Sequence, residues 1–217
     1  MSTSTFDEDF DFGRIEREFR SMLDEAPEMT YPILMVSPDM LKNSPDLKKY
    51  LTLPWCAIKV HGYFHPWQPF GKPIRRILAI ARDLGLPVML HTGGRDRSDA
   101  GSHSRLCAEF HDVPMILAHG RPIAQAIRVM KDCGNVFADT AFMPLDDVKA
   151  AIAAGLSDRI VFGSDLPANK EFYPRVSYAK WYKPQVEGLF GLNAPEFSKW
   201  TRGNFVMLFK KRPSVLP

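Results

Sequence analysis

The sequence predicts an α/β fold, in which a parallel sheet of short strands is covered by helices. Two observations lead to this prediction. Short apolar runs alternate along the chain with segments whose apolar residues recur at helical spacing. The apolar runs are continuous rather than alternating, which is typical of strands buried on both faces of a parallel sheet.

The first expected element is an amphipathic helix in GRIEREFRSMLDEA, where Ile15, Phe19, Met22 and Leu23 recur at helical spacing. Six apolar runs follow it and are expected to be strands: YPILMVS, CAIKVH, LPVMLHT, VPMILAH, NVFADT and RIVFGSD. Helical spacing returns between them, at Ile74, Ile77, Leu78, Ala81 and Leu84, at Ala126, Ile127 and Met130, and at Val148 and Ile152. The period therefore switches repeatedly between that of a strand and that of a helix.

Length and composition bound the class of protein. The 217 residues, of which 45% are hydrophobic, suffice for one core, so we expect one domain over 1–217 with a loose leader at 1–13 and a tail at 211–217. A net charge of +3 argues against a dedicated nucleic-acid partner, and no apolar run is long enough to cross a membrane. The three cysteines lie in apolar or helical runs, which favours reduced packing residues in a cytoplasmic protein.

Polar residues collect at the ends of the expected strands. His61, His91, His119, Asp139 and Asp165 each stand at the carboxyl end of one apolar run. In a parallel barrel or open sheet these ends meet on one face, so the side chains are expected to converge there. Imidazole and carboxylate groups together suit Zn²⁺, Fe²⁺ or Mn²⁺, and a bound divalent ion would activate a water molecule near neutral pH. Asp139 is the weakest member, because ADTAFMPLDD also fits a simple turn into the next helix.

The ordered set of motifs resembles the amidohydrolase superfamily, in its amidohydrolase-related branch with aminocarboxymuconate-semialdehyde decarboxylase-like and lactonase-like enzymes. The matching segments are IKVHGYFHP, LPVMLHTGG, VPMILAHG, NVFADT, RIVFGSDLP and RGNFVMLF. The resemblance implies a (β/α)₈ TIM-type barrel with one divalent metal ion, most simply zinc, with manganese or iron as alternatives. It implies that His91 and Asp165 are ligands, that Asp165 accepts a proton from the metal-bound water, and that His119 ligates or polarises the substrate. His61 would line the pocket.

One part of the family pattern is missing. The family begins with a strand that carries a His-x-His pair, whereas no histidine precedes His61 here. Six strands also leave two of eight unaccounted for, so we expect a barrel that is incomplete at its N-terminus. His91, Asp165 and His119 would then hold the metal weakly, because catalytic zinc sites have three protein ligands and a water. The open sheet edges would favour a homo-oligomer or pairing with another chain.

Further residues are candidates for substrate binding. Arg95 and Arg121 follow strand ends and suit a substrate carboxylate, and Lys59 and His61 lie on a shared strand. The loop GYFHPWQPFG either walls an aromatic or apolar substrate pocket or, the simpler interpretation, packs as an ordinary proline-rich loop. His103 and His111 fall on a predicted helix and its end, and we expect both at the surface.

The sequence thus predicts a metal-dependent hydrolase that acts on an amide, ester or lactone of a small carboxylate-bearing or aromatic substrate. Alternatives are a decarboxylase of the same branch, a metal-free lactonase, and a truncated subunit without catalysis. A serine-hydrolase elbow and nucleotide-binding glycine motifs are missing from the chain.

Overall fold

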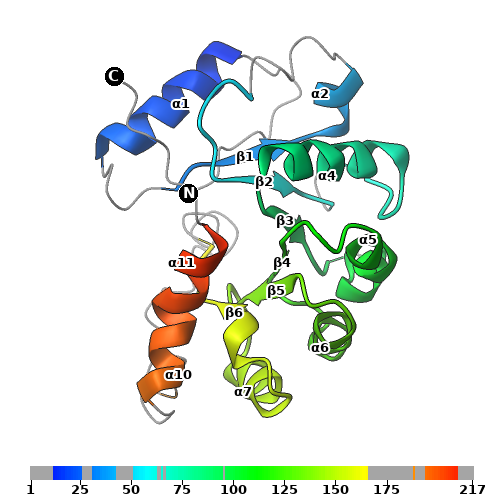
Figure 1. Cartoon of the computed structure of the whole chain (residues 1–217), viewed down its shortest axis with the longest axis vertical. Helices are drawn as coiled ribbons and strands as arrows, with labels where there is room; N and C mark the ends of the chain where they lie inside the picture. Colours follow the sequence, from blue (N-terminus) through cyan, green and yellow to red (C-terminus); the bar gives the residue numbers. More distant parts are fainter. Residues whose placement is uncertain are drawn as a thin grey trace.

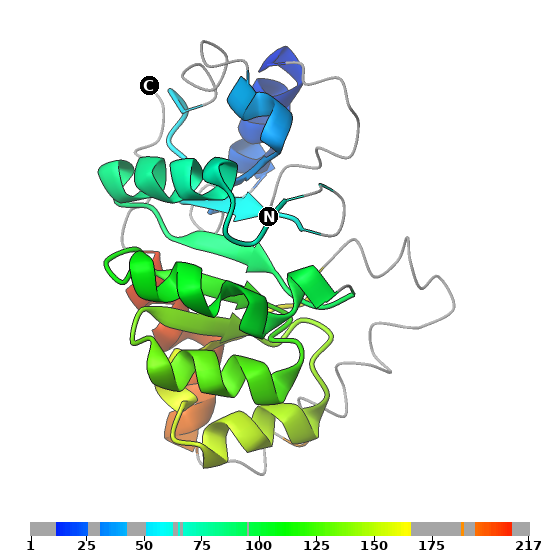
Figure 2. The same ribbon diagram turned by 90° about the vertical axis from the view of Figure 1, so that its right-hand side faces the viewer.

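The chain forms a single sheet of six parallel strands whose spatial order, β1-β2-β3-β4-β5-β6, follows their order in the sequence. The computed structural model describes residues 12–25, 31–42, 51–62, 65, 67–94, 96–165, 188 and 194–209. The sheet curves, with α4 to α7 along its outer side and α11 against its inner side (Figure 1). Figure 2 shows α4, α5, α6 and α7 in one row in front of the strands.

All six expected strands are present in the expected segments. They are β1 (Ile33–Val36), β2 (Ala57–Val60), β3 (Val88–His91), β4 (Met115–Ala118), β5 (Val136–Asp139) and β6 (Ile160–Val161). Every residue of β1, β2, β4 and β5 is buried. Burial on both faces is what the continuous apolar runs predicted, because helices cover one face of a parallel sheet and the barrel interior lies on the other.

Helices occupy the segments between the strands. They are α1 (Phe12–Glu25), α2 (Pro38–Lys42), α4 (Lys72–Leu84), α5 (Ser104–Glu109), α6 (Ile123–Asp132), α7 (Leu145–Ala153), α10 (Ala194–Ser198) and α11 (Asn204–Leu208). Short helical turns are η1 (Asp96–Ser98), η2 (Ala100–His103), η3 (Ser157–Arg159) and η4 (Lys199–Gly203), the last a π-helical turn. None of the described helices is long and apolar enough to span a membrane.

The outer core joins the helices to the sheet. On α4 the buried residues are Ile74, Ile77, Leu78 and Ala81, which is the periodic set seen in the sequence. The helix ends where Gly85 adopts a left-handed conformation (φ 65°) and donates its N–H to the carbonyls of the last turn. Each fully buried aliphatic side chain of this core contributes roughly 1.5–3 kcal/mol to folding.

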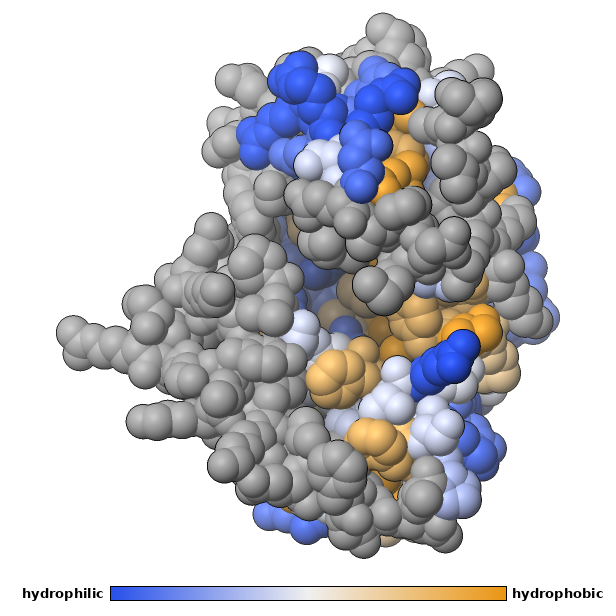
Figure 3. Space-filling view, turned by 90° about the vertical axis from the view of Figure 1, so that its left-hand side faces the viewer, coloured by the Kyte–Doolittle hydropathy of each residue, from blue (hydrophilic) through white to orange (hydrophobic). Residues whose placement is uncertain are grey.

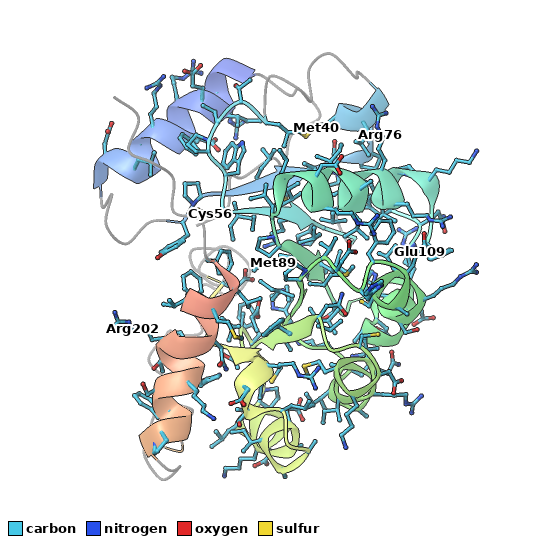
Figure 4. All side chains as sticks on the ribbon, in the orientation of Figure 1. Met40, Cys56, Arg76, Met89, Glu109 and Arg202 are labelled. Atoms are coloured by element: carbon cyan, nitrogen blue, oxygen red, sulfur yellow. The ribbon has the colours of Figure 1, made fainter. Side chains whose placement is uncertain are left out.

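Polar contacts join neighbouring helices at the surface. Arg76 extends from α4 toward α2 and donates to the Leu41 carbonyl at 3.1 Å, and Arg75 pairs with Glu109 on α5 (Figure 4). The second of these pairs is substantially exposed, so it contributes little to stability. The helix layer is therefore held mainly by its apolar face.

The inner side of the sheet packs against α11. Ile116, Phe137 and Val161 form a cluster there with Leu208 and Phe209. Met89 belongs to the same side and points inward from β3 (Figure 4). Part of this apolar surface is exposed to solvent on the face shown in Figure 3, below the hydrophilic helix α1. On α11, Val206 is 51% exposed and Met207 is 47% exposed.

A cavity of about 380 Å³ lies beside α11 at the amino ends of the strands. Its wall is mostly apolar and includes Cys56, Pro87, Pro114 and Phe137. Figure 4 shows Cys56 near the start of β2. The cavity is therefore at the opposite end of the sheet from the polar residues singled out in the sequence.

Two sequence-based expectations were wrong in detail. The strand expected in RIVFGSD ends at Val161, so Asp165 follows β6 by four residues instead of ending the strand. His103 is buried, not at the surface, because η2 packs closely on α6 and turns the side chain inward.

The terminal segments and the expected partner are not tested. The leader at 1–13 and the tail at 211–217 lie almost wholly outside the described residues. The expected pairing of the open sheet edges with a second copy also stays a prediction. All three cysteines are buried and free, in agreement with their interpretation as packing residues.

Candidate functional site

Strand register brings the polar strand-end residues to the inner side of the sheet. Ile58 and Val60 of β2 face the outer core, whereas Ala57 faces the inner cluster. Because successive side chains alternate, Lys59 faces inward on β2, and Lys59 pairs in register with Met89 of β3. The alternation also turns His61 and His91 inward at the carboxyl ends of β2 and β3. His61 and His91 therefore lie at the carboxyl ends of their strands, where the sequence placed them, and the strand register directs them inward.

Three histidine rings lie together at this end of the sheet. The rings of His61 and His91 are stacked, with centroids 3.9 Å apart and planes 19° apart. The ring of His119 meets His91 edge-on, with centroids 4.9 Å apart. His61 and His119 are buried and His91 is half-buried.

The neutral form of two of these histidines is favoured. Burial, followed by the charges of His119 and Lys59, lowers the pKa of His91 to about 3. Burial, with His91 and Lys59 next in size, lowers the pKa of His61 well below its usual range. Both imidazoles are therefore neutral near pH 7, and the fixed positive charges beside them come from lysine and arginine.

His119 is held in an unusual backbone conformation. It has φ 71°, in the left-handed region that residues with side chains rarely adopt. Its backbone N–H donates to Asp139 Oδ1 at 3.0 Å, and its ring Nδ1 lies 3.0 Å from the Ala141 carbonyl. A carbonyl oxygen only accepts hydrogen bonds, so Nδ1 carries the ring proton and Nε2 carries the lone pair in the neutral imidazole.

Arg121 is fixed at the start of the loop that leads into α6. Its backbone N–H donates to Thr92 Oγ1 at 2.8 Å, while that hydroxyl donates to the Ala118 carbonyl at 2.6 Å. The guanidinium Nη2 donates to the Phe142 carbonyl at 2.7 Å. Arg121 contributes to lowering the pKa of His91, so its charge lies near the ring of His91.

Other predicted residues are placed differently or lie outside the description. Asp165 is half-buried after β6 and also adopts a left-handed conformation (φ 54°). Arg95 lies outside the described residues, as do Tyr63 and Phe64 of the aromatic loop. Trp67 is buried in the core and Phe70 packs against it, which agrees with ordinary loop packing rather than a substrate wall.

The residues that the structure describes do not form a three-ligand metal site. Among the residues that the structure describes, no three histidine, cysteine, aspartate or glutamate side chains are spaced to hold one ion. The stacked rings of His61 and His91 direct their nitrogen lone pairs along nearly parallel planes, so they do not aim at one point. Metal ligation by His91, His119 and Asp165 stays a prediction.

Comparison with known protein families decides the family of this chain. The family model described as amidohydrolase matches residues 20–204. The chain belongs to the amidohydrolase family. A search of curated proteins finds no match to it.

Several solved structures resemble this chain. An uncharacterised TIM-barrel protein from Bordetella bronchiseptica is 18% identical, with a TM-score of 0.71 over 89% of this chain and 71% of the other. A protein from Pseudomonas putida assigned as a 2-pyrone-4,6-dicarboxylic acid hydrolase is 16% identical, with a TM-score of 0.63 over 90% and 77%. A 2,6-dihydroxybenzoate decarboxylase from Rhizobium is 14% identical, with a TM-score of 0.60 over 91% and 76%.

These likenesses show the fold of this chain. Its six parallel strands, with helices on the outer side, form part of a (β/α)₈ TIM-type barrel. The predicted fold class is therefore confirmed. In such barrels the carboxyl ends of the strands build the active site, and that is the end where the three histidine rings lie.

Sequence reasoning missed two residues near the candidate site. Thr92 holds the backbone of Arg121, and its only signal in the sequence is its place directly after His91. His103 is buried near His91. Burial lowers the pKa of His103 to about 4, opposed by the nearby backbone of His91. Helical spacing alone gave no signal for this inward position.

Proposed function

We propose that the chain hydrolyses an ester or lactone of a small substrate that carries a carboxylate. The proposal rests on one observation: the neutral imidazoles of His61 and His91 lie near side chains with a fixed positive charge. Lys59 and Arg121 both act on the charge state of His91, whose ring contacts those of His61 and His119. Such a group of side chains suits an anionic substrate with a reactive carbonyl.

Arg121 and Lys59 bind the substrate carboxylate in this proposal. The guanidinium of Arg121 is steadied by the Phe142 carbonyl, and Phe142 also lies under it at 5.9 Å. A held guanidinium loses less conformational freedom when it binds, and it offers paired donors to a carboxylate. Two of the similar structures are named after compounds that carry a carboxylate on a planar ring, 2-pyrone-4,6-dicarboxylic acid and 2,6-dihydroxybenzoate. Both compounds agree with this substrate class.

His119 acts as the general base. Its Nδ1 is engaged by the Ala141 carbonyl, so Nε2 accepts the proton of a water molecule that attacks the carbonyl carbon. The ester C–O bond then breaks and the proton passes to the leaving alkoxide. The cationic side chains stabilise the negative charge that develops on the carbonyl oxygen. Asp165, which lies four residues after the end of β6, is the proposed second proton acceptor.

The direct test is turnover of a lactone panel by the purified chain. We expect the chain to open the ring of 2-pyrone-4,6-dicarboxylate, which is measured as a loss of its absorbance. We expect no ring opening of a lactone without a carboxylate. Arg121→Met removes a charge-assisted hydrogen bond and should raise KM by about 10-fold or more. Arg128→Met is the matched control, because Arg128 is exposed on α6, and it should leave KM unchanged. The same KM in both variants rejects the proposed role of Arg121.

Two other candidates are separated in the same experiment. A zinc requirement, with His91, His119 and Asp165 as proposed ligands, predicts that turnover is lost on chelation and restored by zinc. Decarboxylation is favoured by the similarity to a 2,6-dihydroxybenzoate decarboxylase and predicts CO₂ release from that acid. Asp165→Asn should abolish turnover in each case while the thermal transition is kept. A chain that binds no metal and turns over none of these compounds is a subunit without catalysis.

A further inference from the structure

We propose that Asp139 is a positioning residue that sets the ring tautomer and the direction of His119. The inference rests on the proposed function for its catalytic consequence, but its structural part stands on hydrogen bonds of Asp139 itself. In the sequence alone, Asp139 also fitted a simple turn into the next helix.

One oxygen of Asp139 joins two loops of the active-site end. The side chain is 7% exposed at the end of β5. Its Oδ1 accepts a hydrogen bond from the backbone N–H of His119 at 3.0 Å and another from the backbone N–H of Ala141 at 3.0 Å. The first bond reaches the loop that follows β4, and the second closes a turn two residues further along its own loop.

The two bonds together determine where the ring of His119 is held. The first fixes the backbone of His119 in its left-handed conformation. The second fixes the turn that carries the Ala141 carbonyl, to which His119 Nδ1 donates. Because the carbonyl keeps the proton on Nδ1, the lone pair stays on Nε2. Asp139 therefore controls His119 through its backbone and through its ring partner at once.

The backbone that follows β6 limits the space around the Asp139 carboxylate. A Cβ atom added at Gly163, after β6, would lie 3.1 Å from both Cγ and Oδ1 of Asp139. The backbone N–H of Gly163 donates to Thr140 Oγ1 at 3.2 Å, so this segment is tied to the residue next to Asp139. The absence of a side chain at position 163 thus leaves space for Asp139 to reach both N–H groups.

The test measures the tautomer of His119 by ¹⁵N NMR of the imidazole ring. In parallel, kcat and KM are measured on 2-pyrone-4,6-dicarboxylate, the lactone that the chain is expected to open. The wild-type chain should show a proton on Nδ1. Asp139→Asn keeps an oxygen acceptor at the same place and should keep both the tautomer and a kcat within about threefold. Asp139→Ala should give a mixture of tautomers and lower kcat by about 10- to 100-fold, with KM changed by less than about threefold.

A second pair of variants displaces the carboxylate without removing it. Gly163→Ala should push Asp139 away from its partners and should shift the ring signals of His119 in the direction seen for Asp139→Ala. Gly134→Ala is the control, because no atom lies within 4 Å of its added Cβ, and it should change neither signal nor kcat. If Asp139→Ala does not fold, Gly163→Ala carries the test.

The outcomes separate this inference from the proposed function. A tautomer that changes in Asp139→Ala or Gly163→Ala and is kept in Asp139→Asn supports the positioning role, even if the chain opens no lactone. A tautomer that is unchanged in both Asp139→Ala and Gly163→Ala overturns it, even if lactone hydrolysis is found. Loss of the tautomer in Asp139→Asn to the same degree as in Asp139→Ala also overturns it.

Discussion

Asn204 joins the C-terminal helix to the last strand, and its removal should destabilise the whole fold. The side chain is 5% exposed at the first residue of α11. Its Nδ2 donates to the Ser157 carbonyl at 2.8 Å and to the Ile160 carbonyl at 2.7 Å. Through these bonds α11 is held against the inner side of the sheet, next to the inner apolar cluster.

The expected loss follows from the two carbonyls that would lose their donor. Ile160 is buried in β6, so in the variant its carbonyl would lose the hydrogen bond from Asn204 without gaining one from water. An unsatisfied buried carbonyl costs about 1–3 kcal/mol of stability. Ser157 is only half-buried and water reaches it more easily, so its share is smaller. Asn204→Ala should therefore lower the free energy of unfolding by about 2–4 kcal/mol, a large part of the roughly 5–15 kcal/mol typical of a domain.

Asn204→Asp distinguishes hydrogen bonding from packing. Aspartate has nearly the same size, but an ionised carboxylate only accepts hydrogen bonds and would face two carbonyl oxygens. The buried, unpaired charge should make this variant less stable than Asn204→Ala, with a loss of about 3–5 kcal/mol. Urea unfolding, followed by tryptophan fluorescence, to which the buried Trp200 contributes, measures the stability of the wild-type chain and of both variants.

Thr201→Val is the matched control on the neighbouring turn. Thr201 Oγ1 also donates to a backbone carbonyl, that of Phe197 at 2.8 Å, but the residue is exposed. Its loss should cost less than about 0.5 kcal/mol. The reasoning fails if Asn204→Asp unfolds at the wild-type urea concentration, or if Asn204→Ala costs no more than the control.

Further predictions concern pH, cysteine reactivity and a close-packed glycine. Burial lowers the pKa of His103 to about 4, below the roughly 6.5 of the unfolded chain, so the unfolded state binds more protons between these values. Stability should fall as pH drops from about 6.5 to 4, by at most about 3 kcal/mol, and urea titrations of His103→Leu should show a shallower slope; an unchanged slope contradicts this. Burial raises the pKa of Cys107 to about 12, so iodoacetamide should label it at least about 100-fold faster in urea than in the native state, and equal rates would contradict it. Gly120→Ala should cost about 2–4 kcal/mol in the same urea assay, because φ is 53° and the new Cβ would lie 2.5 Å from Met143, whereas Gly134→Ala should be near neutral; similar losses in both would exclude this cause.

The order of elements was accessible from the sequence because it depends on local patterns. Six continuous apolar runs became six parallel strands in the expected segments. The buried positions of α4 were the periodic ones, from Ile74 to Ala81. The end of the last strand was less accessible, because β6 is only two residues long and Asp165 falls beyond it. A strand end depends on which neighbour it pairs with, and apolar residues alone do not specify that.

The candidate site was predicted in its composition and only partly in its geometry. His61, His91 and His119 do lie together, as the shared strand-end position indicated. Asp139 was interpreted as a weak candidate, yet it binds the backbone of His119. This bond joins residues 20 positions apart, so no local pattern reports it.

The sequence by itself determined the α/β class, the alternation of strands and helices, and the polar residues at the strand ends, because hydrophobic periodicity is a property of each segment. The tertiary structure alone decided which of these side chains meet and how they are directed. The stacking of His61 on His91, the left-handed backbone of His119 and the inward position of His103 follow from strand register and from hydrogen bonds between distant loops. These depend on the curvature of the whole sheet, since each loop takes its conformation from partners that other strands bring to it.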